Sequence, residues 1–546
     1  MHYLTRAKRL LSLGFVQSVE KLVRDIGLDE CSKEELLLLD LELAQFSKNA
    51  KEIELSLIRL IDNSSDNSDY VVRLAELYVS QNKFEDAICC YRKYLDSKSE
   101  DADVRFNLGL VLKKSGKLED AINAFESALE SSVNSQAEVL NSMAIAYVEL
   151  GKIEQAENCY LKALEFNPNS NMVRLNYASL LEQQGRKELA LANYNKILGQ
   201  TPTYYDALIR IAYLEKHNQE NDTTLRKLNR ALRKSSLTDA EREGLYYALG
   251  KVYDDMRKYH LSFECYLKAN SFSKVRVGTY SSELTENIST SIRRAYSTSI
   301  IRDTSDRTES PTFICGMFRS GSTLLESILG RTGAIMPGGE LSYFPSLLVK
   351  SNGQLANKLF CKTGKNLLEN YAEEYLSFCQ KRFPDVKHLT DKRPDNFLFI
   401  GFIKRVFPEA KIIVTRRNRY DNALSIYFQQ LSALFPYAND LRDCLHYYSV
   451  FEELLTFWLE LFPKDIMVVD YETLILQTSS TIENCLEFLG KNKNTNYSPH
   501  TPDREPDKAR INTASLWQVR EPIYTSSINR WQHYSQFAMS SLTHKK

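Results

Sequence analysis

The stretch Phe313-Ile-Cys-Gly-Met-Phe-Arg-Ser-Gly-Ser-Thr-Leu-Leu325 decides the fold of the C-terminal half of this chain. A short apolar run, typical of a buried strand, breaks into a small polar loop and then into a segment with helical character. At such a turn the first N–H groups of the helix lack intrahelical partners, and the helix dipole favours an anion. Gly321 lets the backbone approach an oxyanion closely, and Arg319 adds a permanent positive charge. The stretch therefore predicts a strand, an anion-binding loop and a helix.

This loop differs from the phosphate-binding loop of NTPases. The Gly-x-x-x-x-Gly-Lys-Ser/Thr spacing is missing, and the basic residue Arg319 precedes Gly321-Ser-Thr323 instead of following a glycine. A nucleotide-dependent kinase is therefore disfavoured. Taken alone, the loop is equally compatible with a plain turn that joins a strand to a helix.

A second motif, Gly338-Gly339-Glu340, places its glutamate 21 residues after Arg319. The two motifs together resemble the sulfotransferases that use 3′-phosphoadenosine 5′-phosphosulfate (PAPS), above all the tyrosylprotein sulfotransferase branch with its Pro-Arg-Ser-Gly-Thr-Thr-Leu loop. Phe318 replaces the proline of that loop, and Ser322 replaces a threonine. The resemblance implies that the donor is bound by Arg319, Ser320, Gly321, Ser322, Thr323 and Leu324.

The segment Lys411-Ile-Ile-Val-Thr-Arg-Arg-Asn-Arg-Tyr-Asp-Asn-Ala-Leu-Ser425 is predicted to be a strand that turns into a helix. Basic residues stand at the carboxyl end of this strand, where open α/β sheets bind ligands. The resemblance implies that Arg417 and Ser425 hold the 3′-phosphate of the nucleotide. The adjacent Arg416 is an alternative to Arg417 in that role.

Further matches extend the resemblance over roughly residues 311 to 535. Lys392, in Leu389-Thr-Asp-Lys-Arg-Pro-Asp-Asn396, is implied to approach the transferred sulfuryl group. Near the C-terminus, Ser515 is implied to reach the reaction centre and Arg530 the 3′-phosphate. Tyr471 matches a Tyr-Glu pair that ends a strand in the family, although core packing explains this tyrosine almost as well.

These residues suggest which groups act as the base and which stabilise the leaving group. Sulfuryl transfer to an alcohol needs a base for the hydroxyl proton and positive donors for the departing phosphate oxygens. We assign Glu340 as the base and Arg319 and Lys392 as the groups that stabilise the leaving group. No metal is expected, because the sequence lacks metal-ligand spacing. The acceptor stays open between a tyrosine in a protein or peptide and a carbohydrate or small-molecule hydroxyl, and a non-catalytic nucleotide-binding repeat scaffold is the rival hypothesis.

Small residues recur every 34 or 35 residues in the N-terminal half, with 38 at the last step. One series runs through Ala75, Gly109, Ala144, Ala178, Ala212 and Gly250, and an aromatic series through Tyr91, Phe125, Tyr160, Tyr194 and Tyr266. This period resembles the tetratricopeptide repeat, in which small residues sit where two helices cross closely. Such repeats imply a groove that recruits an acceptor protein or peptide.

The predicted fold class is therefore two-domain: an all-α tetratricopeptide-repeat solenoid, then an α/β P-loop-like sulfotransferase domain with a parallel sheet. The predicted limits are residues 1–273 for the solenoid, with degenerate repeats at 1–65, and 311–546 for the sulfotransferase domain. Residues 274–310 form a helix and a linker rich in Ser, Thr, Asp and Arg.

The composition of the chain indicates its possible partners and its cellular compartment. Formal net charge is +0, so no overall field steers the chain to nucleic acid or anionic lipid. The 10 cysteines show no paired-ligand spacing, which favours a reduced, cytoplasmic compartment. No segment has the length of a membrane span or a secretory leader. We expect neither a nucleic-acid nor a membrane partner, and a homo-oligomer is compatible with the sequence.

Overall fold

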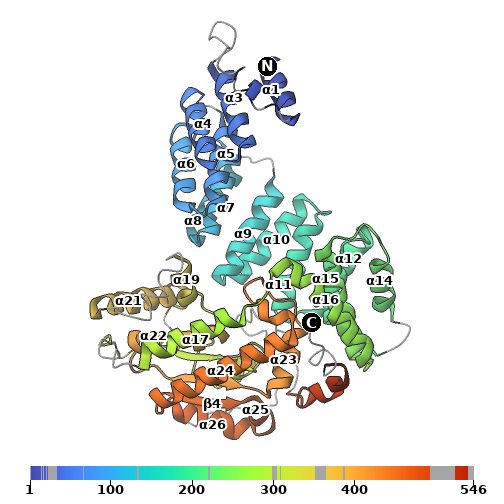
Figure 1. Cartoon of the computed structure of the whole chain (residues 1–546), viewed down its shortest axis with the longest axis vertical. Coiled ribbons are helices and arrows are strands. Elements are labelled where there is room, and N and C mark those ends of the chain that lie inside the picture. Colours follow the sequence, from blue (N-terminus) through green and yellow to red (C-terminus); the bar gives the residue numbers. More distant parts are fainter. Residues whose placement is uncertain are drawn as a thin grey trace. The chain divides into compact units, whose positions relative to one another are not determined.

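The computed structural model describes residues 2–13, 15, 17–19, 21, 33–64, 67–131, 135–218, 222–297, 304–307, 309–350, 364–384, 386, 388–491 and 523–538. The chain divides into two compact units, Met1–Tyr177 and Ala178–Lys546. Figure 1 shows helical hairpins in the first unit, and helices together with a sheet in the second. The predicted solenoid and sulfotransferase limits remain a prediction, since this division falls inside the repeats.

Antiparallel helix pairs build the first unit. Its helices are α1 (His2–Ser12), α3 (Lys33–Phe46), α4 (Ala50–Asn63), α5 (Ser68–Ser80), α6 (Phe84–Ser97), α7 (Ala102–Lys114), α8 (Leu118–Glu130), α9 (Gln136–Leu150), α10 (Ile153–Phe166) and the start of α11 (Asn171–Gln183). The small series marks close crossings: a Cβ on Gly109 would lie 2.4 Å from Cε1 of Phe125. The periodic pattern is thus a packing pattern, as tetratricopeptide repeats require.

The repeats continue into the second unit. Its first helices are the rest of α11, α12 (Lys187–Gln200), α13 (Tyr205–Leu214), α14 (Thr223–Leu232), α15 (Asp239–Asp255), α16 (Tyr259–Val277) and α17 (Ser282–Ser297). Gly250 repeats the close crossing, because a Cβ there would lie 2.8 Å from Cε1 of Tyr266. Helix α17 coincides with the helix predicted ahead of the linker.

Four parallel strands form the described sheet, in the order β2-β1-β3-β4. They are β1 (Thr312–Gly316), β2 (Thr390–Lys392), β3 (Ile412–Arg416) and β4 (Ile466–Asp470). Strand β1 lies between β2 and β3, so the loops that follow these three strands open at one edge of the sheet. The predicted fold class, helical repeats followed by an α/β domain with a parallel sheet, is confirmed.

Helices cover both faces of this sheet. Successive residues of a strand point to opposite faces, so neighbouring residues of β1 pack in two different cores. Phe313 packs in one core with residues of α17, α21 (Lys365–Arg382), α22 (Ile400–Val406) and α24 (Leu441–Leu461). Its neighbour Ile314 packs in the other with α18 (Ser322–Arg331), α25 (Tyr471–Leu476) and α26 (Thr478–Phe488). The remaining described elements are α19 (Tyr343–Lys350), η2 (Pro394–Phe399), α23 (Arg419–Tyr427), η3 (Pro436–Asn439) and η4 (Arg530–Tyr534). None of the helices with assigned coordinates is both long and apolar enough to cross a membrane.

Within the second unit, the last repeat hairpin packs on the α/β domain. The rings of Tyr266 and Phe428 stack with centroids 3.9 Å apart. The side chain of Asn270 donates to the carbonyl of Tyr427 at 3.0 Å, and Lys274 pairs with Asp440 at 2.7 Å. This packing brings the repeat helices α15 and α16 to the elements that form the candidate site.

Candidate functional site

The loop after β1 contains two residues with a positive φ, only one of which is a glycine. Arg319 has a φ of 65° and Gly321 a φ of 96°, both in the left-handed region that side chains rarely adopt. The Ser320 hydroxyl lies 2.6 Å from both the carbonyl of Met317 and Oγ1 of Thr415, which ties the loop to β3. A Cβ on Gly321 would lie 2.5 Å from Cδ2 of Tyr471. The loop is therefore held rigid at the start of α18, with Ser322 and Thr323 buried in its first turn.

Two arginines converge on this loop. Nε of Arg319 donates to Oγ of Ser425 at 3.2 Å, and Nη1 of Arg417 donates to the carbonyl of Arg319 at 3.1 Å. Burial, with the nearby charges of Arg417 and Arg530, lowers the pKa of the Arg319 guanidinium to about 10. Positive charges this close repel one another, and an anion placed among them would relieve the repulsion. The arrangement fits a ligand with several negative groups.

The two adjacent arginines at the end of β3, Arg416 and Arg417, make different contacts. Arg416 binds Asp470 through two bonds, Nε to Oδ1 at 2.7 Å and Nη2 to Oδ2 at 3.0 Å. Arg417 instead turns to the loop and also donates to the carbonyl of Ser527 at 2.8 Å. A bidentate carboxylate thus already engages Arg416, whereas Arg417 donates to two backbone carbonyls. Which of the two binds a phosphate stays a prediction.

Tyr471 stands at the end of β4, where the sequence predicted it. The guanidinium carbon of Arg417 lies 4.6 Å from the centroid of its ring, and its hydroxyl lies 2.7 Å from Oγ of Ser527. The ring thus contacts Arg417 within the range of a cation–π interaction, and its Cδ2 edge borders Gly321.

Glu340 and Lys392 form an ion pair with Nζ 2.7 Å from Oε1. Lys392 is fully buried, whereas Glu340 is 30% exposed. The amide of Lys392 also donates to the carbonyl of Gly339 at 2.9 Å, so β2 fixes the loop that carries the glutamate. A partly exposed carboxylate beside a buried ammonium can exchange a proton with an incoming hydroxyl.

Glu326 was not predicted, and it connects this pair to the anion loop. From α18, its Oε1 accepts from the amide of Gly339 at 3.0 Å and from Oγ1 of Thr390 at 2.5 Å. Burial raises the pKa of this carboxyl, against the opposing charge of Lys392. The sequence held a signal: Glu326 occupies an apolar position of α18, whose neighbours Leu325 and Leu329 are fully buried.

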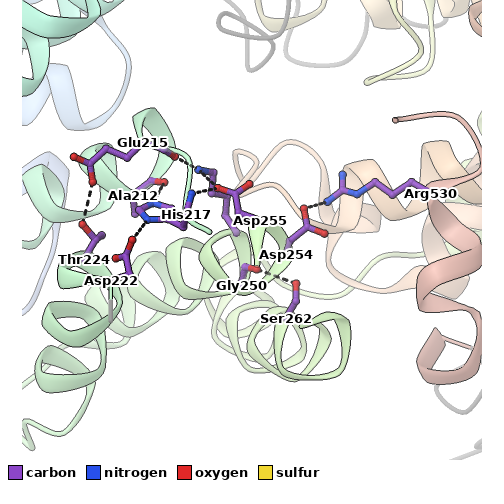
Figure 2. A network of polar contacts seen from close by, with 11 residues as sticks. Ala212, Glu215, His217, Asp222, Thr224, Gly250, Asp254, Asp255, Ser262 and Arg530 are labelled. Carbon is purple, nitrogen blue, oxygen red and sulfur yellow. Dashed lines mark hydrogen bonds and ion pairs between the residues drawn. The ribbon is translucent and has the colours of Figure 1, made fainter. Parts of the chain in front are cut away.

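Arg530 lies at the start of η4 and is placed by contacts from two directions. The amides of Asn529 and Trp531 each donate to the carboxylate of Asp421 at 2.7 Å. Its own Nη2 lies 2.6 Å from Oδ2 of Asp254 in the repeat helix α15, as Figure 2 shows. Sequence reasoning missed Asp254, because nothing in the linear order connects positions this far apart.

The structure thus brings together Arg319, Ser320, Gly321, Ser322, Thr323, Arg417, Ser425 and Tyr471, with Glu340 and Lys392 reached through Glu326. Leu324 packs at the edge of the core around Leu325. Ser515 lies outside the described residues. Among the residues with assigned positions, no group of His, Cys, Asp and Glu could hold a metal ion.

In this chain, helical repeats precede an α/β domain in which a loop that carries Arg319 follows β1. Residues 311–493 match the model of the sulfotransferase family, and residues 100–169, 141–205 and 244–274 match tetratricopeptide repeat models. The chain therefore joins tetratricopeptide repeats to a sulfotransferase-family domain. The predicted resemblance to this class is confirmed.

The chain is also similar to individual proteins and to solved structures. An uncharacterized protein of Aquifex aeolicus (strain VF5) is 28% identical over 373 residues, which cover 66% of this chain and 48% of the relative. Protein-tyrosine sulfotransferase A of Caenorhabditis elegans is 25% identical over 195 residues, 34% of this chain and 50% of that protein. The solved structure of YrrB, a TPR protein with an unusual peptide-binding site, is 20% identical, with a TM-score of 0.26 over 38% of this chain and 96% of YrrB. This chain spans about half the length of the curated relatives it matches.

Proposed function

We propose that this protein is a PAPS-dependent sulfotransferase that moves a sulfuryl group to an acceptor hydroxyl. The observation that carries the proposal is the position of helix α18. Its first turn follows the arginine-bearing loop, and Glu326, one turn further on, binds the Gly-Gly-Glu loop through the amide of Gly339. The anion loop and the loop that carries the candidate base are thereby both fixed to one helix, which supports the precise placement that group transfer requires.

Within this proposal, Glu340 takes the proton of the acceptor hydroxyl. Its carboxylate is partly exposed, and Lys392 holds it in place through the 2.7 Å contact. Lys392 and Arg319 then offset the charge that develops on the departing phosphate oxygens, together with the first amides of α18. PAPS supplies the sulfuryl group when bound. Ser515 keeps its proposed place at the reaction centre.

The nucleotide would be held by the arginine cluster. We assign the 5′ end of the donor to Ser320, Gly321, Ser322, Thr323 and Leu324. The 3′-phosphate is assigned to Arg417, Ser425 and Arg530, with Tyr471 supporting Arg417 through its ring. Burial, and after it the charge of Arg417, lowers the pKa of Arg319, and a bound polyanion would offset both effects, which supports this assignment.

We propose a protein or peptide tyrosine as the acceptor, recruited by the repeats. The support is the similarity to protein-tyrosine sulfotransferases and the use of tetratricopeptide repeats in protein–protein contacts. A panel of tyrosine peptides and glycans tests this choice with a labelled sulfuryl group. Transfer to glycans alone would contradict the tyrosine assignment and keep the sulfotransferase.

We also place the protein in the cytoplasm. Eight cysteines, in the part of the chain whose placement is known, are free, which suits a reducing compartment. Fractionation of cells that express the chain tests this assignment, and recovery from an oxidising compartment would refute it.

The deciding experiment is calorimetric titration with adenosine 3′,5′-bisphosphate (PAP), the expected product. The wild type should bind PAP, and Arg417→Ala should bind at least roughly tenfold more weakly, because it loses a charge-assisted contact to phosphate. Arg416→Ala is the matched control and should bind as the wild type, since Asp470 already engages Arg416.

Glu340→Gln separates binding from chemistry. This variant should keep the affinity for PAP and lose turnover by about 10²-fold or more, because the amide cannot take a proton. Absence of PAP binding in the wild type would refute the proposed function. Binding of ATP with magnesium in preference to PAP would favour a kinase, and PAP binding without transfer to any acceptor would favour the scaffold.

A further inference from the structure

One carboxylate of the repeats, Asp254, binds the C-terminal 3-10 helix η4. It lies near the end of α15 and is 19% exposed. Its Oδ2 is 2.6 Å from Nη2 of Arg530, and its Oδ1 accepts from the hydroxyl of Tyr534. Figure 2 shows the Asp254–Arg530 contact joining the repeat helices to the C-terminal segment. A residue of the solenoid therefore contacts a residue assigned to the nucleotide.

The guanidinium of Arg530 is fixed by more than this ion pair. Its carbon lies 5.3 Å from the ring centroid of Phe428 and 6.0 Å from that of Tyr534. Tyr534 is itself buried and lies 3.1 Å, hydroxyl to hydroxyl, from Ser262 of α16. Burial opposes the charge, yet Asp254 and the neighbouring tyrosines raise the pKa of Arg530 above its ordinary value. Arg530 is thus a fully charged group in a rigid aromatic setting.

Arg530 also belongs to the positive cluster at the anion loop. Its charge contributes to the lowered pKa of Arg319, and the charges of Arg319, Arg417 and Arg530 all act on the phenol of Tyr524. The Asp254 carboxylate is the negative partner that offsets part of the repulsion between Arg530 and the other two arginines.

We propose that Asp254 is a positioning residue for the nucleotide, through which the last repeat sets the orientation of Arg530 toward the 3′-phosphate. This inference rests on the proposed function. A guanidinium has five N–H donors in a planar fork, and Asp254 engages one terminal nitrogen. The remaining donors can meet a phosphate while Asp254 keeps the plane fixed.

The geometry favours positioning over competition between Asp254 and the phosphate. Asp254 is held in turn by Tyr534, and the aromatic rings restrict rotation of Arg530. An arginine placed in advance loses less conformational entropy when the ligand binds. The sulfotransferase site would then be complete only with the repeat helix α15 in place.

The next residue in the chain, Asp255, provides a matched control. Its Oδ2 accepts from the amide of His217 at 3.1 Å and pairs with Lys251 at 2.7 Å. Figure 2 shows Asp255 directed toward His217, whereas Asp254 is directed toward Arg530. Asp255→Asn therefore removes the same charge from the same helical turn without touching the proposed phosphate contact.

The test compares PAP with adenosine 5′-monophosphate (AMP), which lacks the 3′-phosphate, by calorimetry on the full chain. Asp254→Asn should weaken PAP binding roughly tenfold and leave AMP binding unchanged. In turnover, the KM for PAPS should rise while kcat stays near the wild-type value. Asp255→Asn should match the wild type with both nucleotides.

The outcomes separate this inference from the proposed function. If the wild type binds PAP no better than AMP, the proposed function fails. If the wild type prefers PAP, and Asp254→Asn weakens both nucleotides equally, leaves PAP unaffected or tightens it, the positioning role is wrong. Should Asp254→Asn not fold, the affinities for PAP and AMP are compared in Asp254→Glu instead. Its longer side chain keeps the charge but displaces Arg530, so PAP binding alone should weaken.

Discussion

At the residue scale, Gly321 meets two separate demands. Its φ of 96° penalises any side chain, and a Cβ would lie 2.5 Å from the ring of Tyr471. Gly321→Ala should therefore push away Tyr471, which supports Arg417. We expect a loss of unfolding free energy of about 1–3 kcal/mol, measured by denaturant titration, together with a loss of PAP binding measured by calorimetry.

Gly333→Ala is the control that measures the effect of a positive φ on stability without a clash of the added Cβ. Gly333 has a φ of 70°, and nothing lies within 4 Å of the position that a Cβ would take. This variant should lose about 1–2 kcal/mol of stability and keep the wild-type affinity for PAP. Equal PAP affinity in Gly321→Ala and Gly333→Ala would show that the contact between the loop and Tyr471 has no part in the site.

Local sequence identified the residues of the loop, and tertiary contacts distinguish neighbouring residues further. The sequence favoured Arg417 over Arg416 by its spacing from Ser425, and the structure adds that Arg416 is paired with Asp470, at the end of the next strand. Asp254 and Ser527 could not be predicted at all, because their partners come from distant segments. The assignments to Glu340, Lys392, Ser515 and the nucleotide-binding residues stay predictions until binding and turnover are measured.

At the element scale, the repeats and the sheet were predictable for different reasons. The repeats have a period, and each small residue in it, such as Gly109 or Gly250, meets one aromatic partner. The strands β1 and β3 are apolar runs that the sequence marks directly. Strand β2, Thr390–Lys392, is short and polar, and its burial comes from its neighbours in the fold. Its strand character therefore could not be read from the local pattern.

Helix α18 connects the anion loop to β2 and the Gly-Gly-Glu loop through Glu326. Glu326→Ala should release the amide of Gly339 and the hydroxyl of Thr390, so that Glu340 is no longer held. We expect kcat to fall about tenfold or more, since misplacement of a catalytic group by 1 Å can cost 10²-fold. PAP affinity should change little. Steady-state kinetics and calorimetry on the same preparations measure both.

Glu326→Gln is the control, because it keeps an acceptor at Oε1. Its kcat should stay near the wild-type value, and a kcat as low as that of Glu326→Ala would contradict the role given to the hydrogen bonds.

The stability of the protein should also depend on the protonation of Glu326. Burial raises the pKa of Glu326 above 4.5 in the folded state, so the folded protein binds more protons than the unfolded chain above that pH. The wild type should therefore lose stability relative to Glu326→Gln as pH rises from 4.5 through the raised pKa. Thermal melts across that range test the sign.

At the scale of the whole molecule, the compact units do not follow the boundary between repeats and α/β domain. The second unit begins at Ala178, inside the repeats. Its last hairpin is joined to the α/β domain by the stack of Tyr266 on Phe428 and by the hydrogen bond from Asn270 to the carbonyl of Tyr427. Sequence periodicity marks where repeats occur, but it carries no information on which repeats share a core with another domain.

Two truncations test what this packing contributes. The fragment 169–546 starts before α11 and keeps every contact of α15 and α16 with the α/β domain. It should fold cooperatively and bind PAP with the affinity of the full chain.

The fragment 278–546 starts after α16. It should lose the aromatic contact at Phe428 and the partner of Arg530. We expect it to aggregate or to bind PAP at least tenfold more weakly, at a cost of about 1.4 kcal/mol or more. Full PAP affinity in 278–546 would mean that the sulfotransferase domain is independent of the repeats.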